Sequence, residues 1–180
     1  MTDPTPAASH PTARPLAPLW LSGSVRRWHC NPALSNSHQT NADHQGRCVL
    51  LLLALHPDPS VALIRAVASH DVGEMMVGDL PGPFKRMVPG LAQQHADHEA
   101  LVRQSIFGLE DELAPEDALW LQLLDQLDAH CWCLTQNLTE YQRAASGWLD
   151  AETRLEQRAK DLGCWDQVAQ LLADLFGGQW

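Results

Sequence analysis

Apolar positions along the chain recur with the period of an α-helix. His44, Cys48, Leu51 and Leu55 follow a 4-3-4 spacing, which places them on one face of a helix that Thr40 or the next residue caps. No segment alternates apolar and polar residues with the period of two that is typical of a strand. Further predicted helices cover residues 61–77, 90–107, 115–141, 149–163 and 164–178. The pattern predicts an all-α fold.

Turn-forming residues separate these helices. "HPDPS" at 56–60 ends the first helix, and Ser60 is placed to cap the second. On the second helix, Leu63, Val67, His70 and Glu74 fall one turn apart on one face. "GDLPGP" at 78–83 then forces a turn.

The composition of the 180 residues bounds the domain organisation. Apolar residues make up 45% of the chain, which is enough for one helical core over residues 19–180. Residues 1–18 are rich in Pro, Ala and Thr and are predicted to be a disordered tail, and residues 19–39 an irregular lead-in. The longest apolar run, at 48–55, is too short to span a bilayer, so we expect no membrane partner.

The net charge and the pattern of cysteines limit the classes of function and the cellular compartment that we expect. The net charge of −10 argues against binding to nucleic acid, which requires a basic surface. The five cysteines form no CxxC pair and no secretion signal precedes them, so reduced thiols in the cytoplasm are expected.

Four polar residues stand on otherwise apolar helix faces: His44, His70, Asp71 and Asp125. Buried imidazoles and carboxylates need partners, and one divalent cation would satisfy all four. Two nitrogen and two oxygen donors suit Zn, Co or Mn, with Ni or Fe as alternatives. Each residue alone is more often a satisfied core histidine or a solvated aspartate, but the ordered set on three helices is more specific. "HADHE" at 95–99 also has metal-capable spacing, although a solvated helix face is the preferred interpretation.

This ordered set resembles the HD-domain phosphohydrolase superfamily. The resemblance rests on "RRW" at 26–28, "NADHQGR" at 41–47, "SHDVGEMMVGDLPGPFK" at 69–85 and "LLDQLDA" at 123–129. Within the superfamily the chain is most similar to bacterial 5′-deoxyribonucleotidases and to small phage dATP triphosphohydrolases. The resemblance implies a single HD-type helical bundle with its metal site between helices.

The resemblance also implies roles for individual residues. His44, His70, Asp71 and Asp125 would bind one metal ion, with a second ion left open, and Asp71 and Glu74 would act in catalysis. Asp125 is preferred over Asp128 because the family's aspartate precedes a pattern such as "QLDA".

The substrate-binding residues carried over from the family are Arg27, Trp28, Cys30, Asp79, Pro83 and Lys85. Arg27 and Lys85 would hold phosphate, and Asp79 would sense deoxyribose. Trp28, Cys30 and Pro83 would border the base.

The function implied is hydrolysis of dATP to deoxyadenosine and triphosphate, with dADP and dAMP as further substrates. In a phage-infected cell this reaction would lower the dATP pool of the host cytoplasm. The alternatives are a 5′-deoxyribonucleotidase acting on monophosphates and a non-catalytic nucleotide-binding module. Additional cations near Arg26, Arg47 or Arg86 would favour the triphosphate. The expected partners are a deoxynucleotide and, because relatives assemble, further copies of the chain.

Overall fold

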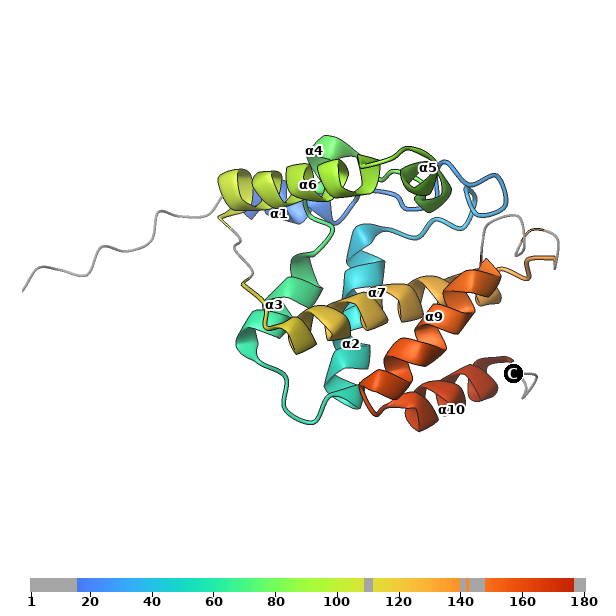
Figure 1. The fold of residues 1–180 in the computed structure, drawn as a ribbon. Helices are drawn as coiled ribbons and strands as arrows, with labels where there is room; N and C mark the ends of the chain where they lie inside the picture. Colours follow the sequence, from blue (N-terminus) through green and yellow to red (C-terminus); the bar gives the residue numbers. More distant parts are fainter. Residues whose placement is uncertain (1–15, 109–111, 140–141, 143–147, 177–180) are drawn as a thin grey trace, which may run out of the picture.

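A computed structural model of the protein describes residues 16–108, 112–139, 142 and 148–176. Every regular element in these residues is a helix, which confirms the predicted all-α class. The helices form two layers, with α1, α4, α5 and α6 above α2, α3, α7, α9 and α10 (Figure 1).

The lower layer is built around the long helix α7 (Pro115–Thr135). Helices α2 (Asn41–Leu55) and α3 (Val61–Ser69) pack against α7 and against each other. Helix α9 (Trp148–Asp161) also packs on α7, and α10 (Trp165–Phe176) contacts both of them. The fully buried side chains between these helices form the core, among them Leu52, Leu63, Leu123, Leu127 and Leu172.

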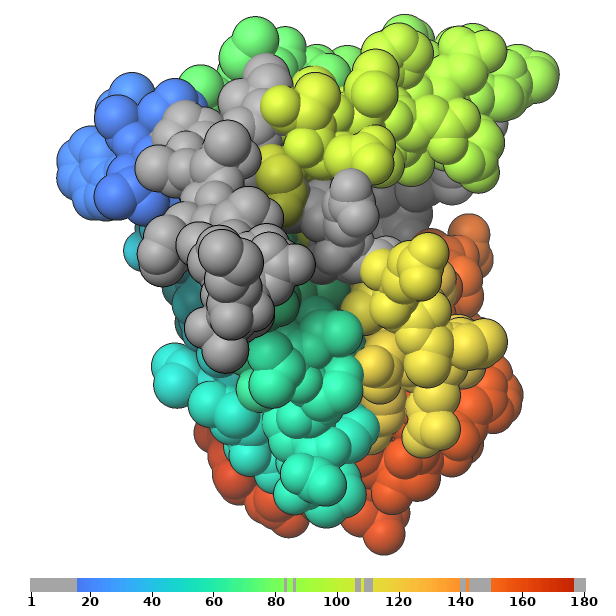
Figure 2. Space-filling view, turned by 90° about the vertical axis from the view of Figure 1, so that its left-hand side faces the viewer, coloured from blue at the N-terminus to red at the C-terminus, as the bar shows by residue number. Residues whose placement is uncertain are grey.

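The upper layer contains α1 (Leu16–Ser22), α4 (Glu74–Val77), α5 (Gly82–Met87) and α6 (Leu91–Phe107). Helix α6 packs on α4 and α5, and α1 contacts α4. In the space-filling view, the yellow-green α6 lies at the top, above the turquoise-green α3 and the yellow start of α7 (Figure 2). The two layers leave between them the space in which the polar residues gather.

Local capping starts the helices at the predicted places. The Thr40 side chain accepts a hydrogen bond from the Asp43 backbone N–H, and Asp43 accepts one from the Thr40 backbone N–H. This reciprocal capping box fixes the start of α2 and therefore the orientation of His44 one turn later. Ser60 caps α3 in the same manner through the Leu63 N–H.

Three predicted boundaries differ from the structure. The second helix ends at Ser69 instead of running on through Glu74, and α4 begins a new turn at Glu74. The helix from Pro115 ends at Thr135 instead of residue 141. Residues 16–18, assigned to the tail, and 19–22, assigned to the irregular lead-in, belong to α1. Residues 1–15 of the predicted tail lie outside the described part of the chain.

Tertiary contacts explain why the second helix breaks. Asn41 of α2 donates its side-chain amide to the backbone carbonyl of Asp71, 3.0 Å away. Gly73 allows the backbone to approach α6, because an added Cβ would lie 2.9 Å from the Glu99 carbonyl oxygen. The chain can therefore leave the helix after Ser69 and re-enter a helical turn at Glu74.

Among the described residues, no helix combines the length and the apolar character that a membrane span requires.

Candidate metal centre

A cleft of about 620 Å³ lies between the two layers and contains most of the residues singled out in the sequence. The predicted site residues that line it are Arg27, Trp28, Cys30, His70, Asp71, Glu74, Asp79, Lys85 and Asp125. His44 is fully buried behind this wall, at 0% exposure. The backbone of Pro83 lies in α5, but its side chain is outside the described residues.

His44 is oriented by a carboxylate on the neighbouring helix. Its Nδ1 lies 2.6 Å from Oδ2 of Asp128, which is itself buried in α7. Asp128 also accepts hydrogen bonds from Gln39, at 2.9 Å, and from Arg47. A carboxylate on one ring nitrogen fixes the tautomer and directs the other nitrogen, Nε2, toward the cleft wall.

His70 is oriented by a backbone carbonyl. Its Nδ1 lies 2.9 Å from the carbonyl oxygen of Val67, which can only accept a hydrogen bond. Nδ1 therefore carries a proton, and Nε2 of the neutral ring presents a lone pair. The Nε2 atoms of His44 and His70 face one another at 3.0 Å. Two lone pairs at this distance repel each other unless a proton or a metal ion lies between them.

Two carboxylates adjoin this pair of nitrogens. Oδ1 of Asp125 is 3.2 Å from His44 Nε2, and Oδ2 of Asp71 is 3.6 Å from the same atom. Ligand atoms at about 2.1 Å from one ion stand roughly 3.0–3.4 Å apart in octahedral or tetrahedral coordination. The spacing of these nitrogen and oxygen atoms is close to that range.

Adjacent residues of a continuous helix point about 100° apart. His70 and Asp71 nevertheless reach the same point, because α3 ends at Ser69 and the chain turns. The helix end anticipated from the sequence is present, but α3 ends at Ser69, nine residues before Gly78 begins the "GDLP" turn.

The electrostatics of the cluster favour a positive charge. Burial opposes protonation of His44, but hydrogen bonds to Asp125 and Asp128 outweigh it and raise its pKa to about 11. Burial likewise opposes ionisation of Asp125, yet the His44 contact and nearby positive charges hold its pKa below the usual range. In the protein without metal, the positive charge of the cluster is that of protonated His44. A metal ion that binds His44 would have to displace this proton.

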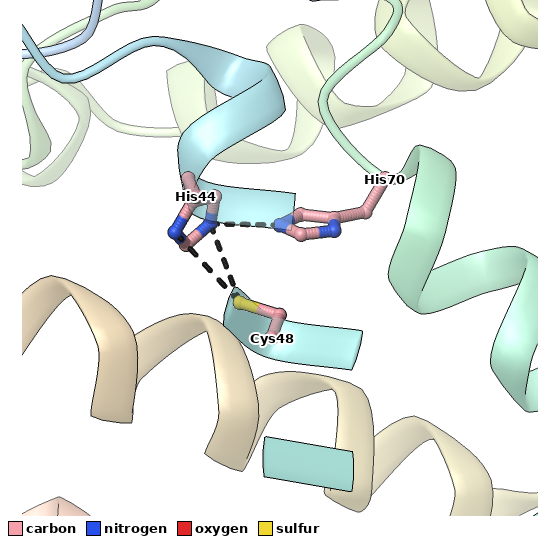
Figure 3. Close-up of side chains that lie close together, drawn as sticks. All are labelled: His44, Cys48 and His70. Carbon is pink, nitrogen blue, oxygen red and sulfur yellow. Dashed lines mark hydrogen bonds between the residues drawn. The ribbon is translucent and has the colours of Figure 1, made fainter. Parts of the chain in front are cut away.

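His44, Cys48 and His70 form a group that could hold a metal ion, since their ligand atoms lie within 4.8 Å of one another (Figure 3). The Sγ atom of Cys48 is 3.7 Å from Nδ1 and 3.9 Å from Nε2 of His44. It also lies 3.4 Å from the Leu124 carbonyl oxygen, to which the thiol donates. Near-equal distances to both nitrogens place the sulfur beside the imidazole ring and not ahead of the Nε2 lone pair. Burial raises the pKa of the Cys48 thiol, which disfavours the thiolate form that metals bind.

Glu74 is buried beside the same cluster. The Asn41 side chain donates to its Oε2 at 2.9 Å, which orients the carboxylate. Burial first, and then the charges of Asp71 and Asp79, raise the pKa of Glu74 to about 8. A carboxyl group with a pKa near neutrality is suited to moving protons.

Arg27 and Trp28 form the wall nearest the N-terminal segment. Arg27 forms an ion pair with Asp71, and its second terminal nitrogen lies 3.7 Å from Asp125. Trp28 has a φ of 64° and donates its indole N–H to Gln39. A bulky residue in the left-handed region is strained, and such strain is concentrated at functional sites.

Several residues at the site were not expected. Asp128, considered in the sequence only as an alternative ligand, supports His44 from behind instead, and Asn41 orients Glu74. Asp128 is three residues after Asp125 on α7, and Asn41 is three residues before His44 on α2. This spacing, which makes two residues neighbours on a helix surface, is the feature of the sequence that could have predicted them. Arg154 and Arg158 of α9 also line the cleft, although nothing in their local sequence distinguishes them from solvated helix residues.

Two interpretations are corrected. Neither Arg26 nor Arg47 lines the cleft, and Arg47 instead pairs with Asp128 and lies over the Trp132 ring. The side chain of Arg86, the third cation considered for the triphosphate, is outside the described residues. "HADHE" is not a uniformly solvated face, because His95 is buried and its Nε2 contacts the Gly78 carbonyl oxygen at 2.9 Å. Helix α6 thereby holds the start of the "GDLP" turn.

No protein-family model, curated protein or solved structure matches the chain.

Proposed function

We propose that the protein is a metal-dependent phosphohydrolase of deoxynucleotides, and that its preferred reaction converts dATP to deoxyadenosine and triphosphate. The observation that carries this proposal is the pair of facing Nε2 atoms, 3.0 Å apart, with two carboxylates at their side. This cluster stands at the wall of a cleft that also contains cationic side chains suited to phosphate.

The ligands in this proposal are His44, His70, Asp71 and Asp125. Cys48 is left out because its sulfur lies beside the His44 ring and its thiol donates to Leu124. Two imidazoles with two carboxylates suit Zn, Co, Mn, Ni or Fe in the divalent state better than calcium or magnesium. When bound, the ion supplies Lewis-acid charge next to the phosphate and lowers the pKa of water.

Side chains of the protein carry out the other steps of the proposed reaction. Glu74, held by Asn41, takes a proton from the attacking water. The water oxygen forms a bond to the α-phosphorus, the bond from phosphorus to O5′ breaks, and Glu74 returns the proton to O5′, which leaves as the hydroxyl of deoxyadenosine while triphosphate is released. Arg27 and Lys85 hold the phosphate oxygens, on which negative charge develops.

The "GDLP" turn supplies the sugar contact in this proposal. Asp79 lines the cleft together with Glu74 and Lys85, and His95 contacts the carbonyl oxygen of the preceding residue, Gly78. A carboxylate held against the sugar accepts a hydrogen bond from the 3′-hydroxyl and leaves no space for a 2′-hydroxyl. ATP is therefore expected to be a poor substrate.

Product analysis by chromatography tests the proposal. Purified protein with Mn²⁺ or Co²⁺ is offered the four dNTPs, the four dNMPs and ATP. Direct conversion of dATP to deoxyadenosine and triphosphate is the expected result. Activity confined to monophosphates would favour a 5′-deoxyribonucleotidase, and no turnover at all would favour a non-catalytic nucleotide-binding module.

Two variants test the assigned chemistry. Glu74→Gln and Asp71→Ala are expected to abolish hydrolysis while circular dichroism remains helical. Turnover that persists in either folded variant would contradict the mechanism.

A further inference from the structure

Helix α9 brings two arginines to the cleft, on the side formed with α7. Arg154 and Arg158 stand four residues apart and therefore lie one above the other on one helix face. Both line the cleft, together with Ala151 one turn earlier. Like charges at this spacing repel each other weakly, and a bound anion would relieve that repulsion.

The described part of the chain contains no carboxylate that forms an ion pair with either guanidinium. Two acidic residues of α9 have other partners: Glu156 pairs with Lys160, and Asp161 accepts a hydrogen bond from Gln157. Two cationic side chains in one cleft without an acidic partner indicate a site for a negatively charged ligand.

Arg158 is held in position by the neighbouring helix. Its guanidinium donates to the side-chain oxygen of Gln126, whose amide nitrogen donates in turn to the Ala151 carbonyl. Gln126 lines the cleft beside Asp125 in α7, so this contact holds Arg158 at the α7 side of the cleft. A guanidinium has five N–H donors, and the donors not used by Gln126 remain available to a ligand.

The cationic side chains of the cleft are more numerous than one phosphate requires. Four of the chain's twelve lysine and arginine side chains line it, beside five carboxyl groups, those of Asp71, Glu74, Asp79, Glu99 and Asp125. Arg27, which pairs with Asp71, and Lys85 are the residues that hold a single phosphate in the proposed function. Arg154 and Arg158 add two planar guanidinium groups, each of which can donate two parallel hydrogen bonds to phosphate oxygens.

We propose that Arg154 and Arg158 form a subsite for the outer phosphates of a deoxynucleoside triphosphate. This inference rests on the proposed function, and it names the feature that distinguishes a triphosphate from a monophosphate substrate. A monophosphate does not extend to α9, so its turnover does not depend on the pair.

The test compares Arg154→Ala/Arg158→Ala with the wild type and with Lys160→Ala. Lys160 is a matched control because it lies on the same helix, is half exposed and does not line the cleft. Two readouts are taken at one fixed concentration of free Mn²⁺: steady-state kinetics with dATP and dAMP, and calorimetric binding of inorganic tripolyphosphate. Tripolyphosphate has no base, so it separates a phosphate subsite from arginines that stack on adenine.

The double variant is expected to lose about tenfold or more in kcat/KM for dATP and in affinity for tripolyphosphate, the loss of one or two charge-assisted contacts. Turnover of dAMP is expected to stay within about twofold of the wild type, and Lys160→Ala is expected to change neither readout. Arg154→Lys/Arg158→Lys should recover part of the affinity.

Failure of this inference is distinguishable from failure of the proposed function. Equal losses with dATP and dAMP, an equal effect of Lys160→Ala, or unchanged tripolyphosphate binding would overturn the subsite while hydrolysis by the wild type still supports the function. A wild type without hydrolytic activity whose tripolyphosphate affinity falls only in the double variant would overturn the function and retain the anion subsite.

Discussion

His44 Nδ1 and Asp128 Oδ2 lie 2.6 Å apart in the interior of the protein, on two different helices. The contact joins α2 to α7 and fixes which nitrogen of His44 faces the cleft. Gln39 and Arg47 bind the same carboxylate, so its position is itself determined. A support of this kind increases the basicity and the order of a metal-binding imidazole.

Asp128→Asn is expected to lower metal affinity about 10- to 100-fold without removing a ligand. The amide cannot match the charge that holds the Nδ1 proton, so the correct tautomer of His44 becomes less favoured. Calorimetric titration with Co²⁺ or Zn²⁺ measures the change, with the exposed surface substitution Asp166→Asn as control. Equal affinity in Asp128→Asn and the wild type would show that His44 does not bind the ion.

A second prediction separates the two possible donor sets. Cys48→Ala is expected to bind metal within about threefold of the wild type, at a cost of roughly 1–2 kcal/mol in stability for the small core cavity. Asp125→Ala should lower affinity by more than the roughly 10–100-fold typical of an outer-shell change. The absorption spectrum of the Co²⁺ form provides a second check, because a thiolate ligand adds a strong near-ultraviolet charge-transfer band. That band, or loss of binding in Cys48→Ala, would make His44, Cys48 and His70 the ligand set.

A third prediction concerns the stability of the protein in EDTA as a function of pH. The pKa of Glu74 is about 8 in the folded protein, against an ordinary value of 4.5, so the folded state holds this proton more tightly than the unfolded chain. Its contribution to stability is complete below about pH 4.5 and is lost as the pH rises to about 8, with a slope of at most about 1.4 kcal/mol per pH unit. Glu74→Gln cannot titrate and is expected to lack this part of the decline.

Urea unfolding between pH 5 and 9 measures the difference between the two proteins. The raised pKa of His44 adds a decline of the same sign above its ordinary value of 6.5. That decline is present in both proteins, so subtracting one curve from the other isolates Glu74. Parallel curves would contradict the burial and charge environment assigned to Glu74.

A fourth prediction tests the contact between the two segments that frame Glu74. Gly73→Ala places a Cβ 2.9 Å from the Glu99 backbone oxygen, so α4 and α6 must move apart, at an expected cost of about 1–3 kcal/mol. Gly46→Ala is the matched control, because its Cβ meets nothing within 4 Å and alanine favours the exposed interior of α2 by roughly 0.5–1 kcal/mol. Thermal unfolding should therefore shift in opposite directions for the two variants. A shift in the same direction would contradict the close packing at Gly73.

The sequence by itself determined the helical class and most helix boundaries. These depend on local chemistry: the Thr40 and Ser60 caps, the "HPDPS" stop and the period of apolar positions all act within a few residues. The burial of His44 could likewise be predicted, because it shares a stripe with Cys48. The break after Ser69 could not, because it depends on contacts with Asn41 and with the α6 backbone.

The composition of the site was decided by the tertiary structure. Asp125 and Asp128 are one turn apart on α7. The packing of α2 against α7 determines that Asp125 lines the cleft and that Asp128 contacts His44 Nδ1, on the opposite side of the ring from Nε2. Arg154 and Arg158 have the local sequence of solvated helix residues, and they reach the cleft because α9 packs on α7 through Gln126. Local interactions define each helix, whereas the side chains that meet between helices follow from long-range packing, which has no periodic signal in the sequence.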